Sequence, residues 1–148
     1  MSLRRRSLLL GLVAATALTR AAAAAPPKGA AAVLLAWREA VQGGRAEAIA
    51  ALVPEGAEVL FRIPAHPKLP AELRLSRAGL LARLQGSDAR ALGLHKDLLL
   101  PSVKDLRKGT SGRYRASHPH CPEVTWLFAA TPTGRWLLVE VQRKFLEC

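Results

Sequence analysis

The sequence predicts an α+β fold in which N-terminal helices pack on a curved, mostly antiparallel sheet. Three observations support this prediction. Residues 30–53 have apolar side chains at helical spacing. Two apolar runs, residues 124–129 and 136–141, flank a Pro/Gly turn, as the strands of a β-hairpin do. No repeat or second domain is evident, and the length of 148 residues suits one small domain.

Residues 1–24 have the layout of a secretory signal peptide. Three arginines at residues 4–6 precede an apolar stretch, and alanines at residues 21–25 offer Ala-x-Ala cleavage sites. We expect cleavage near Ala23 or Ala24, then a linker at residues 25–29 and a single domain at residues 30–148. The mature protein is therefore expected in the periplasm or outside the cell.

The signal peptide also resembles the twin-arginine type, because Arg5 and Arg6 are followed after one residue by Leu8 and Leu9. The alternative is an ordinary Sec signal that happens to contain three arginines. An uncleaved membrane anchor is a further alternative, although the apolar run is short for a span. After cleavage we expect no stable membrane span.

The mature chain remains basic. The sequence has 22 Lys and Arg against 11 Asp and Glu, and loss of the four signal-peptide arginines leaves a net charge of +7. An exported basic protein meets anionic lipid head groups, cell-wall polymers and acidic partners. An anionic envelope component is therefore one expected partner. The alternative is an ordinary solvated surface.

A basic cluster lies between residues 104 and 115. Its members are Lys104, Arg107, Lys108, Arg113 and Arg115. Only Tyr114 supplies an aromatic ring there, and binding of single-stranded nucleic acid relies on stacking against such rings. We therefore expect no nucleic acid among the partners.

Two helices are predicted at the start of the domain. Residues 30–42 place Val33, Trp37 and further apolar residues on one face, and two glycines follow. Residues 45–53 form the second helix, which ends at Pro54. Together they form a helical hairpin that covers one side of a sheet.

The middle of the chain predicts one strand and one helix. Residues 58–63 form the strand, and three prolines within residues 64–70 exclude a regular element after it. Ser76 is expected to cap a third helix that reaches Gly86, with a further capped turn at residues 87–92. Residues 96–108 are ambiguous between strand and helix.

Three strands are predicted after that. The turn at residues 109–112 leads into a strand at residues 113–117 with one polar face. The hairpin strands follow a loop at residues 118–122 and are apolar at nearly every position. Such runs predict a hairpin at the centre of the sheet, with both faces covered over much of its length.

The order of elements resembles the cystatin-like roll of the nuclear transport factor 2-like superfamily, which includes SnoaL-like cyclases and ketosteroid isomerases. The resemblance rests on Trp37 and Ala40 before the glycine pair, Ile49 and Leu52 before Pro54, Trp126-Leu127-Phe128, and Gly134-Arg135-Trp136. Family members often have an acidic residue after the glycine of the first helix, where this chain has Arg45. The resemblance implies a cone formed by helices against the sheet, whose mouth can hold an apolar small molecule or an active site. A homodimer is one further expected assembly of the chain.

Enzymes of this superfamily place an acid/base pair in the cavity, and the resemblance makes Glu140 and Tyr114 the candidate catalytic residues. Glu140 interrupts an apolar run, and a carboxylate there must reach solvent, pair with an arginine or line a cavity. One interpretation is a partly exposed Glu140 paired with an arginine of a neighbouring strand, such as Arg113 or Arg115. The other is a functional carboxylate in the cavity.

His118, His120 and Cys121 form the densest group of side chains that could bind a metal. Their spacing matches no standard zinc motif, so no metal or other cofactor is expected, and the three residues are weak candidates. Cys121 could instead form a disulfide with Cys148, as expected for two cysteines in an exported domain. The predicted turn sets Cys121 opposite Lys144, and four residues of offset is roughly 13 Å, so the bridge requires a bent tail or a bulge.

The function expected from the sequence is that of an exported binding or interaction module. No phosphate-binding loop, nucleophile elbow or zinc-protease helix occurs in the sequence. The alternative is a small isomerase, dehydratase or cyclase-like enzyme with an acid/base residue in the cavity.

Overall fold

The computed structural model describes residues 29–144 of the chain. The predicted signal peptide, nearly all of the predicted linker and Cys148 lie outside the described residues. None of the described helices has the length and apolar character needed to cross a membrane.

The two N-terminal helices form where the sequence predicts them. Helix α2 (Gly29–Gly43) buries an apolar face that includes Val33 and Trp37, which are 4% and 2% exposed. Helix α3 (Ala46–Ala50) is shorter than predicted, because residues 51–53 form a turn in which Val53 is still buried. The apolar face of α2 packs against strands β5 and β6.

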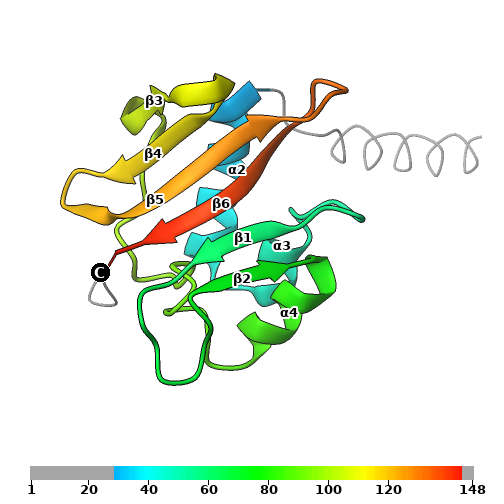
Figure 1. Ribbon diagram of the computed structural model, residues 1–148, viewed down its shortest axis with the longest axis vertical. Coiled ribbons are helices and arrows are strands. Elements are labelled where there is room, and N and C mark those ends of the chain that lie inside the picture. The colour runs from blue at the N-terminus through cyan, green and yellow to red at the C-terminus, as the bar shows by residue number, and fades with distance from the viewer. Residues whose placement is uncertain (1–28, 145–148) are drawn as a thin grey trace, which may run out of the picture.

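The strands form one six-stranded sheet in the order β2-β1-β6-β5-β4-β3 (Figure 1). Their bounds are β1 (Val59–Arg62), β2 (Glu72–Leu75), β3 (Leu106–Lys108), β4 (Tyr114–His118), β5 (Cys121–Ala130) and β6 (Trp136–Arg143). Neighbouring strands are antiparallel, except that β1 runs parallel to β6. The α+β fold class is confirmed, and the predicted hairpin supplies the two central strands.

Strand β2 was not predicted. It pairs with β1 to form the edge of the sheet, and the three prolines lie in the loop between these two strands. Exposed Glu72 and Arg74 alternate with half-buried Leu73 and buried Leu75. This strand pattern is present in the sequence, but the prolines ended the predicted first strand and no element was predicted between them and the Ser76 cap.

The third helix, α4 (Arg77–Gln85), begins as predicted. The Ser76 hydroxyl accepts a hydrogen bond from the backbone N–H of Gly79 at 3.3 Å, which confirms Ser76 as the N-cap. The predicted further turn is present, because residues 89–92 form a turn in which the Leu92 N–H bonds to the Asp88 carbonyl at 3.0 Å. The ambiguous segment contains the 3-10 turn η1 (Val103–Asp105) and then β3.

A β-bulge in β6 decides which way Glu140 points. Leu127 pairs with Glu140, but the next residue, Phe128, pairs with Leu138, so Val139 has no partner in the ladder. A regular strand would alternate from buried Leu138 and point Glu140 into the core beside Trp126. The extra residue turns Glu140 to the opposite face, and Val141 points into the core instead.

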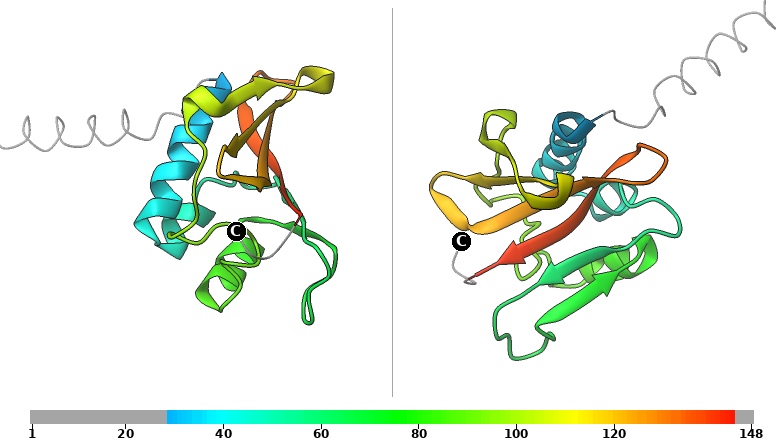
Figure 2. Two further views of the ribbon diagram at one scale, coloured as in Figure 1. Left: turned by 90° about the vertical axis from the view of Figure 1, so that its left-hand side faces the viewer. Right: turned by 45° about the horizontal axis from the view of Figure 1, so that its top comes forward.

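The helices cover one face of the sheet only (Figure 2). Between helices and sheet, Trp37, Phe61, Trp126 and Phe128 are each at most 2% exposed, so side chains fill this layer. On the other face, Thr125, Leu127 and Leu137 are only half-buried. The prediction that both faces of the central strands are covered is therefore wrong for these positions.

Candidate functional site

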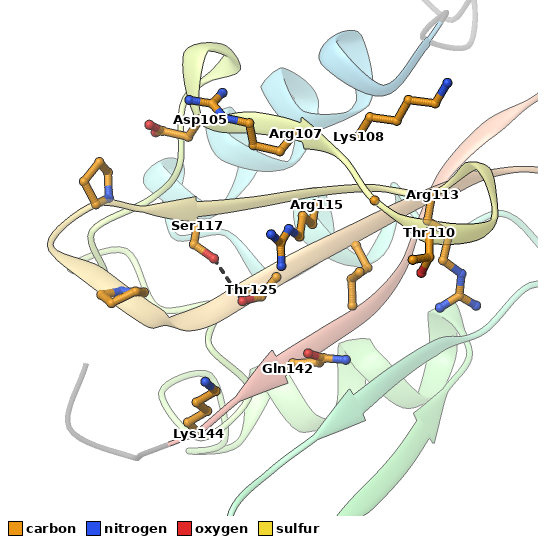
Figure 3. A pocket seen from close by; sticks show the side chains of 14 residues that line it. Asp105, Arg107, Lys108, Thr110, Arg113, Arg115, Ser117, Thr125, Gln142 and Lys144 are labelled. Atoms are coloured by element: carbon orange, nitrogen blue, oxygen red, sulfur yellow. Dashed lines mark hydrogen bonds between the residues drawn. The ribbon is translucent and has the colours of Figure 1, made fainter.

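The face of the sheet opposite the helices is hollowed into a groove of about 930 Å³, which we call the sheet groove (Figure 3). Residues of β4, β5 and β6 form its floor, and β3 with the turn η2 (Thr110–Gly112) forms one wall. Strand alternation explains the floor: while Trp126 and Phe128 of β5 point into the core, Thr125 and Leu127 point into the groove.

Five basic residues line the sheet groove, namely Arg107, Lys108, Arg113, Arg115 and Lys144. Asp105 is the one acidic residue among the described lining residues, so the lining has a formal charge of +4. The first four belong to the basic cluster identified in the sequence. Lys144 was missed, because only the pairing of β6 with β5 brings the end of β6 to this face.

The basic residues of the groove have no acidic partners within residues 29–144. Lys108, Arg113, Arg115 and Lys144 form no side-chain hydrogen bond or ion pair there. Arg107 donates from Nη1 to the carbonyl oxygens of Lys104 and Leu106, at 2.7 and 3.0 Å, which are neutral acceptors. Their positive charges are therefore available to a bound anion.

Two of these charges are directly opposite one another. Arg107 of β3 and Arg115 of β4 are cross-strand partners. Like charges at such positions destabilise a sheet, whereas opposite charges stabilise it. A sheet face that served stability alone would therefore gain from an acidic residue at one of the two positions.

Asp105 does not pair with these arginines. Its carboxylate accepts hydrogen bonds from the backbone N–H of Ser102 at 2.8 Å and from the Ser102 hydroxyl at 3.1 Å. The backbone hydrogen bond is the main reason why the pKa of Asp105 is lower than usual. The carboxylate is therefore ionised at neutral pH and is occupied in capping η1.

Neutral hydrogen-bonding groups lie on the floor beside the cations. The hydroxyl oxygens of Ser117 on β4 and Thr125 on β5 are 2.9 Å apart, and Gln142 is the cross-strand partner of Thr125. Figure 3 shows the hydroxyl pair next to the guanidinium of Arg115. Together these groups can orient the oxygen atoms of an anion held by the basic side chains.

The structure places Glu140 next to this groove, in an ion pair. Its side chain is only 7% exposed, and Arg62 Nε lies 3.4 Å from Glu140 Oε1. Gln142 Nε2 donates a hydrogen bond to the other carboxylate oxygen, and Arg62 also contacts Glu72. Pairing with an arginine of a neighbouring strand is thus confirmed, but the partner is Arg62 rather than Arg113 or Arg115, and Glu140 is buried rather than partly exposed.

Tyr114 lies on the other face of the sheet. It pairs with Phe128 in the ladder, and its ring meets that of Trp136 edge to face at a centroid distance of 5.5 Å. Glu140 pairs with Leu127, the residue before Phe128 on β5. Adjacent positions of a strand point to opposite faces, so the two candidate catalytic residues do not meet.

The predicted metal-binding residues are close in space. The backbone N–H of His120 donates to His118 Nδ1 at 3.0 Å, and the two ring centroids are 5.6 Å apart. Cys121 is fully buried, with 0% exposure. Within residues 29–144, no group of three or more His, Cys, Asp and Glu side chains is placed to hold a metal ion.

The predicted disulfide stays a prediction, because Cys148 lies outside the described residues. The register of the hairpin does bear on it. The predicted turn pairs Val124 with Val141, whereas the structure pairs Val124 with Arg143. The register is thus shifted by two residues. This shift shortens the separation along the strands between Cys121 and Cys148, which was the argument against a bridge.

Comparisons with known proteins give one distant structural similarity. No protein-family model and no curated protein sequence matches the chain. Among solved structures, the chain is similar to ActVI-ORFA from Streptomyces coelicolor, with 19% identity and a TM-score of 0.38. The alignment covers 71% of this chain and 85% of ActVI-ORFA. Nothing about the function of this chain follows from a similarity at that level.

Proposed function

We propose that the protein is an exported binding module with a cystatin-like roll, and that its sheet groove binds an anionic component of the cell envelope. The observation that supports this most strongly is the set of groove cations without acidic partners in the described chain. In the free protein these charges repel one another, most directly at Arg107 and Arg115. A bound anion would replace this repulsion with attraction.

The fold and location in this proposal rest on separate observations. Helices that pack on one face of a mostly antiparallel sheet support the cystatin-like roll. The basic, apolar and alanine-rich order of residues 1–24 supports export. Intact mass spectrometry of protein recovered from the exporting host tests the location, because export with cleavage removes about 23 residues and retention of the full mass contradicts it.

Co-sedimentation with isolated cell envelopes tests the binding function. We expect the exported protein to sediment with envelopes at low salt and to be released as the salt concentration rises, because screening weakens exposed ion pairs. The double variant Arg113→Gln/Arg115→Gln should lose most of this binding. Arg74→Gln/Arg135→Gln is the matched control, since it also removes two charges and both arginines are exposed and lie outside the groove. Equal sedimentation of both variants, or none by the unchanged protein, would contradict the proposal.

An enzyme with Glu140 or Tyr114 in a cavity has less support. Glu140 is engaged by Arg62 and Gln142, and Tyr114 contacts Trp136 on the other face of the sheet. The layer between the helices and the sheet, where an apolar small molecule would enter a cone, is occupied by large aromatic side chains. The structure therefore supports binding of an anion in the groove better than catalysis by Glu140 or Tyr114, and better than binding of an apolar small molecule between the helices and the sheet.

A further inference from the structure

We infer that the ligand of the sheet groove is an extended polyanion with phosphate groups repeated along its chain, rather than a single small anion. This inference rests on the proposed anion-binding function and makes it more specific. Three features of the groove support it: the spread of its charges, the chemistry of its side chains, and its concave shape.

The charges are spread over a distance greater than one anionic group can bridge. Arg115 is opposite Leu127 of β5, whereas the backbone N–H of Lys144 bonds to the carbonyl of Glu123, four residues away along β5. Four residues of strand correspond to about 13 Å, and Arg113 adds about 7 Å beyond Arg115. A single phosphate or carboxylate can contact only a fraction of this length.

The side chains favour phosphate as the repeated group. Three of the five basic residues are arginines, whose planar guanidinium matches two oxygen atoms of a phosphate. Ser117 and Thr125 add hydroxyl groups, and Gln142 adds an amide, between the arginines and Lys144. One hydroxyl of the Ser117–Thr125 pair, and the second amide N–H of Gln142 beside the one bonded to Glu140, can donate hydrogen bonds to the remaining phosphate oxygens.

The apolar lining argues against nucleic acid as the polyanion. It consists of Leu127 on the floor with Pro119 and Pro122. None of the described residues that line the groove is aromatic. Bases of a single strand bind proteins largely by stacking on aromatic rings, so this groove offers contacts to the backbone charge only.

The concave shape argues against a flat membrane surface. Thr125 and Leu127 form part of the groove floor, and the wall that includes Lys108 and Thr110 rises beside them (Figure 3). A flexible chain can enter such a groove and follow it, while a planar bilayer contacts its rim. The basic residues whose side chains face the groove, Arg107, Arg113, Arg115 and Lys144, can therefore act together on a chain but not on a bilayer.

Isothermal titration calorimetry with phosphates of increasing length tests this inference on the exported protein. The probes are orthophosphate, tripolyphosphate and a long-chain polyphosphate. We expect the long chain to bind at least tenfold more tightly per molecule than tripolyphosphate, because it can reach Arg107, Arg113, Arg115 and Lys144 together. If these four residues act together, the logarithm of affinity should fall against that of salt concentration with a slope of about −3.

Matched variants connect this binding to the groove. Arg115→Gln should weaken long-chain binding about tenfold and make the salt slope shallower by about 0.7, which is the share of one phosphate contact. Arg74→Gln should change neither quantity. Circular dichroism of both variants shows whether they are folded, and Lys144→Gln provides a second groove variant with the same expected loss.

The outcomes separate this inference from the proposed function. Tripolyphosphate binding as tightly as the long chain would overturn it in favour of a single-anion site. Equal binding of polygalacturonate would overturn the preference for phosphate, and tighter binding to phosphatidylglycerol vesicles would identify a lipid surface. In each of these cases the proposed anion binding survives. Absence of binding to any anion and to cell envelopes at low salt would overturn both.

Discussion

Glu140 shows how a carboxylate is accommodated in a central strand. The bulge at Val139 turns it away from the aromatic core, and Arg62 and Gln142 then bind its two oxygen atoms. Arg62 is half-exposed and also contacts Glu72, so a chain of charges crosses β6, β1 and β2. The charges of Glu140 and Glu72 are therefore directed toward Arg62 and not toward the sheet groove.

Replacing Glu140 tests the energetic role of this contact. Glu140→Gln should lower the free energy of unfolding by about 1 to 2 kcal/mol, because a nearly buried, charge-assisted contact is lost while Arg62 keeps access to solvent. Urea denaturation measures the change. The control Glu72→Gln removes an exposed partner of the same arginine and should cost at most about 0.5 kcal/mol. Equal losses for the two variants would show that burial of Glu140 has no energetic role.

His95 makes stability depend on pH. Burial lowers the pKa of His95 from the usual value of 6.5, Arg90 and Arg143 lower it further, and Asp97 acts in the opposite direction. At pH values between the lowered pKa of His95 in the folded protein and its usual value of 6.5 in the unfolded chain, the unfolded chain binds more protons than the folded protein. The contribution of His95 to stability is therefore complete above pH 6.5 and decreases as the pH falls below it.

Urea denaturation between about pH 7.5 and 5.5 measures this effect. His95→Gln should make the stability depend less steeply on pH in that range than in the unchanged protein. The comparison variant is His120→Gln, which removes a histidine from an exposed position. An identical slope for the His95 variant would mean that His95 is not the group responsible.

At the scale of elements, the turn between β3 and β4 determines the wall of the groove. Ser111 and Gly112 in η2 both have positive φ, at 58° and 71°, and the turn brings Arg113 to the groove. A left-handed conformation costs little for glycine and more for residues with a Cβ. The sequence Gly-Thr-Ser-Gly is suited to this turn for that reason.

Two glycine substitutions test whether the backbone conformation, rather than a lack of space for a side chain, determines the change in stability. Gly112→Ala should lower the free energy of unfolding by about 1 kcal/mol, because no atom lies within 4 Å of an added Cβ and only the positive φ opposes it. Gly43→Ala, also without neighbours within 4 Å, should raise it by up to about 1 kcal/mol, because Gly43 is helical. Changes of the same sign in urea denaturation would contradict this reasoning.

At the scale of the whole molecule, the ion pairs and the groove cations lie on different parts of the described chain. Within residues 29–144, the four ion pairs involve arginines of β1 and of α4 and none of the groove residues. The groove therefore adds repulsion to the free protein. We expect binding and stability to be opposed at this site, as they often are at functional surfaces.

Arg115→Glu tests this opposition. In the absence of ligand and at low salt, it should raise the melting temperature by roughly 2 to 6 °C, because an acidic residue then lies opposite Arg107. Differential scanning calorimetry measures the shift, which salt should reduce. Arg74→Glu makes the same change in net charge outside the groove and should have a smaller effect. A lower melting temperature for Arg115→Glu would mean that the arginine pair is not a source of instability.

The sequence predicted elements whose signals are local. Four such elements are confirmed: the helix with Trp37, the Ser76 cap, the turn at residues 109–112 and the central hairpin. Their signals are helical spacing, capping and turn chemistry, which depend on neighbours in the chain. Strand β2 was missed because the proline-rich segment before it indicated an end, although prolines are tolerated in a loop that connects two strands.

The sequence by itself determined the α+β class, the central position of the hairpin and the basic cluster. Only the tertiary structure decided which residues share a face. The parallel pairing of β1 with β6 made Arg62 the partner of Glu140, and the bulge at Val139 reversed the direction of Glu140. The register of β6 likewise brought Lys144 to the groove. The physical reason is that the face of a strand residue alternates with every position, so one unpaired residue or one pairing distant in sequence changes the composition of a whole surface.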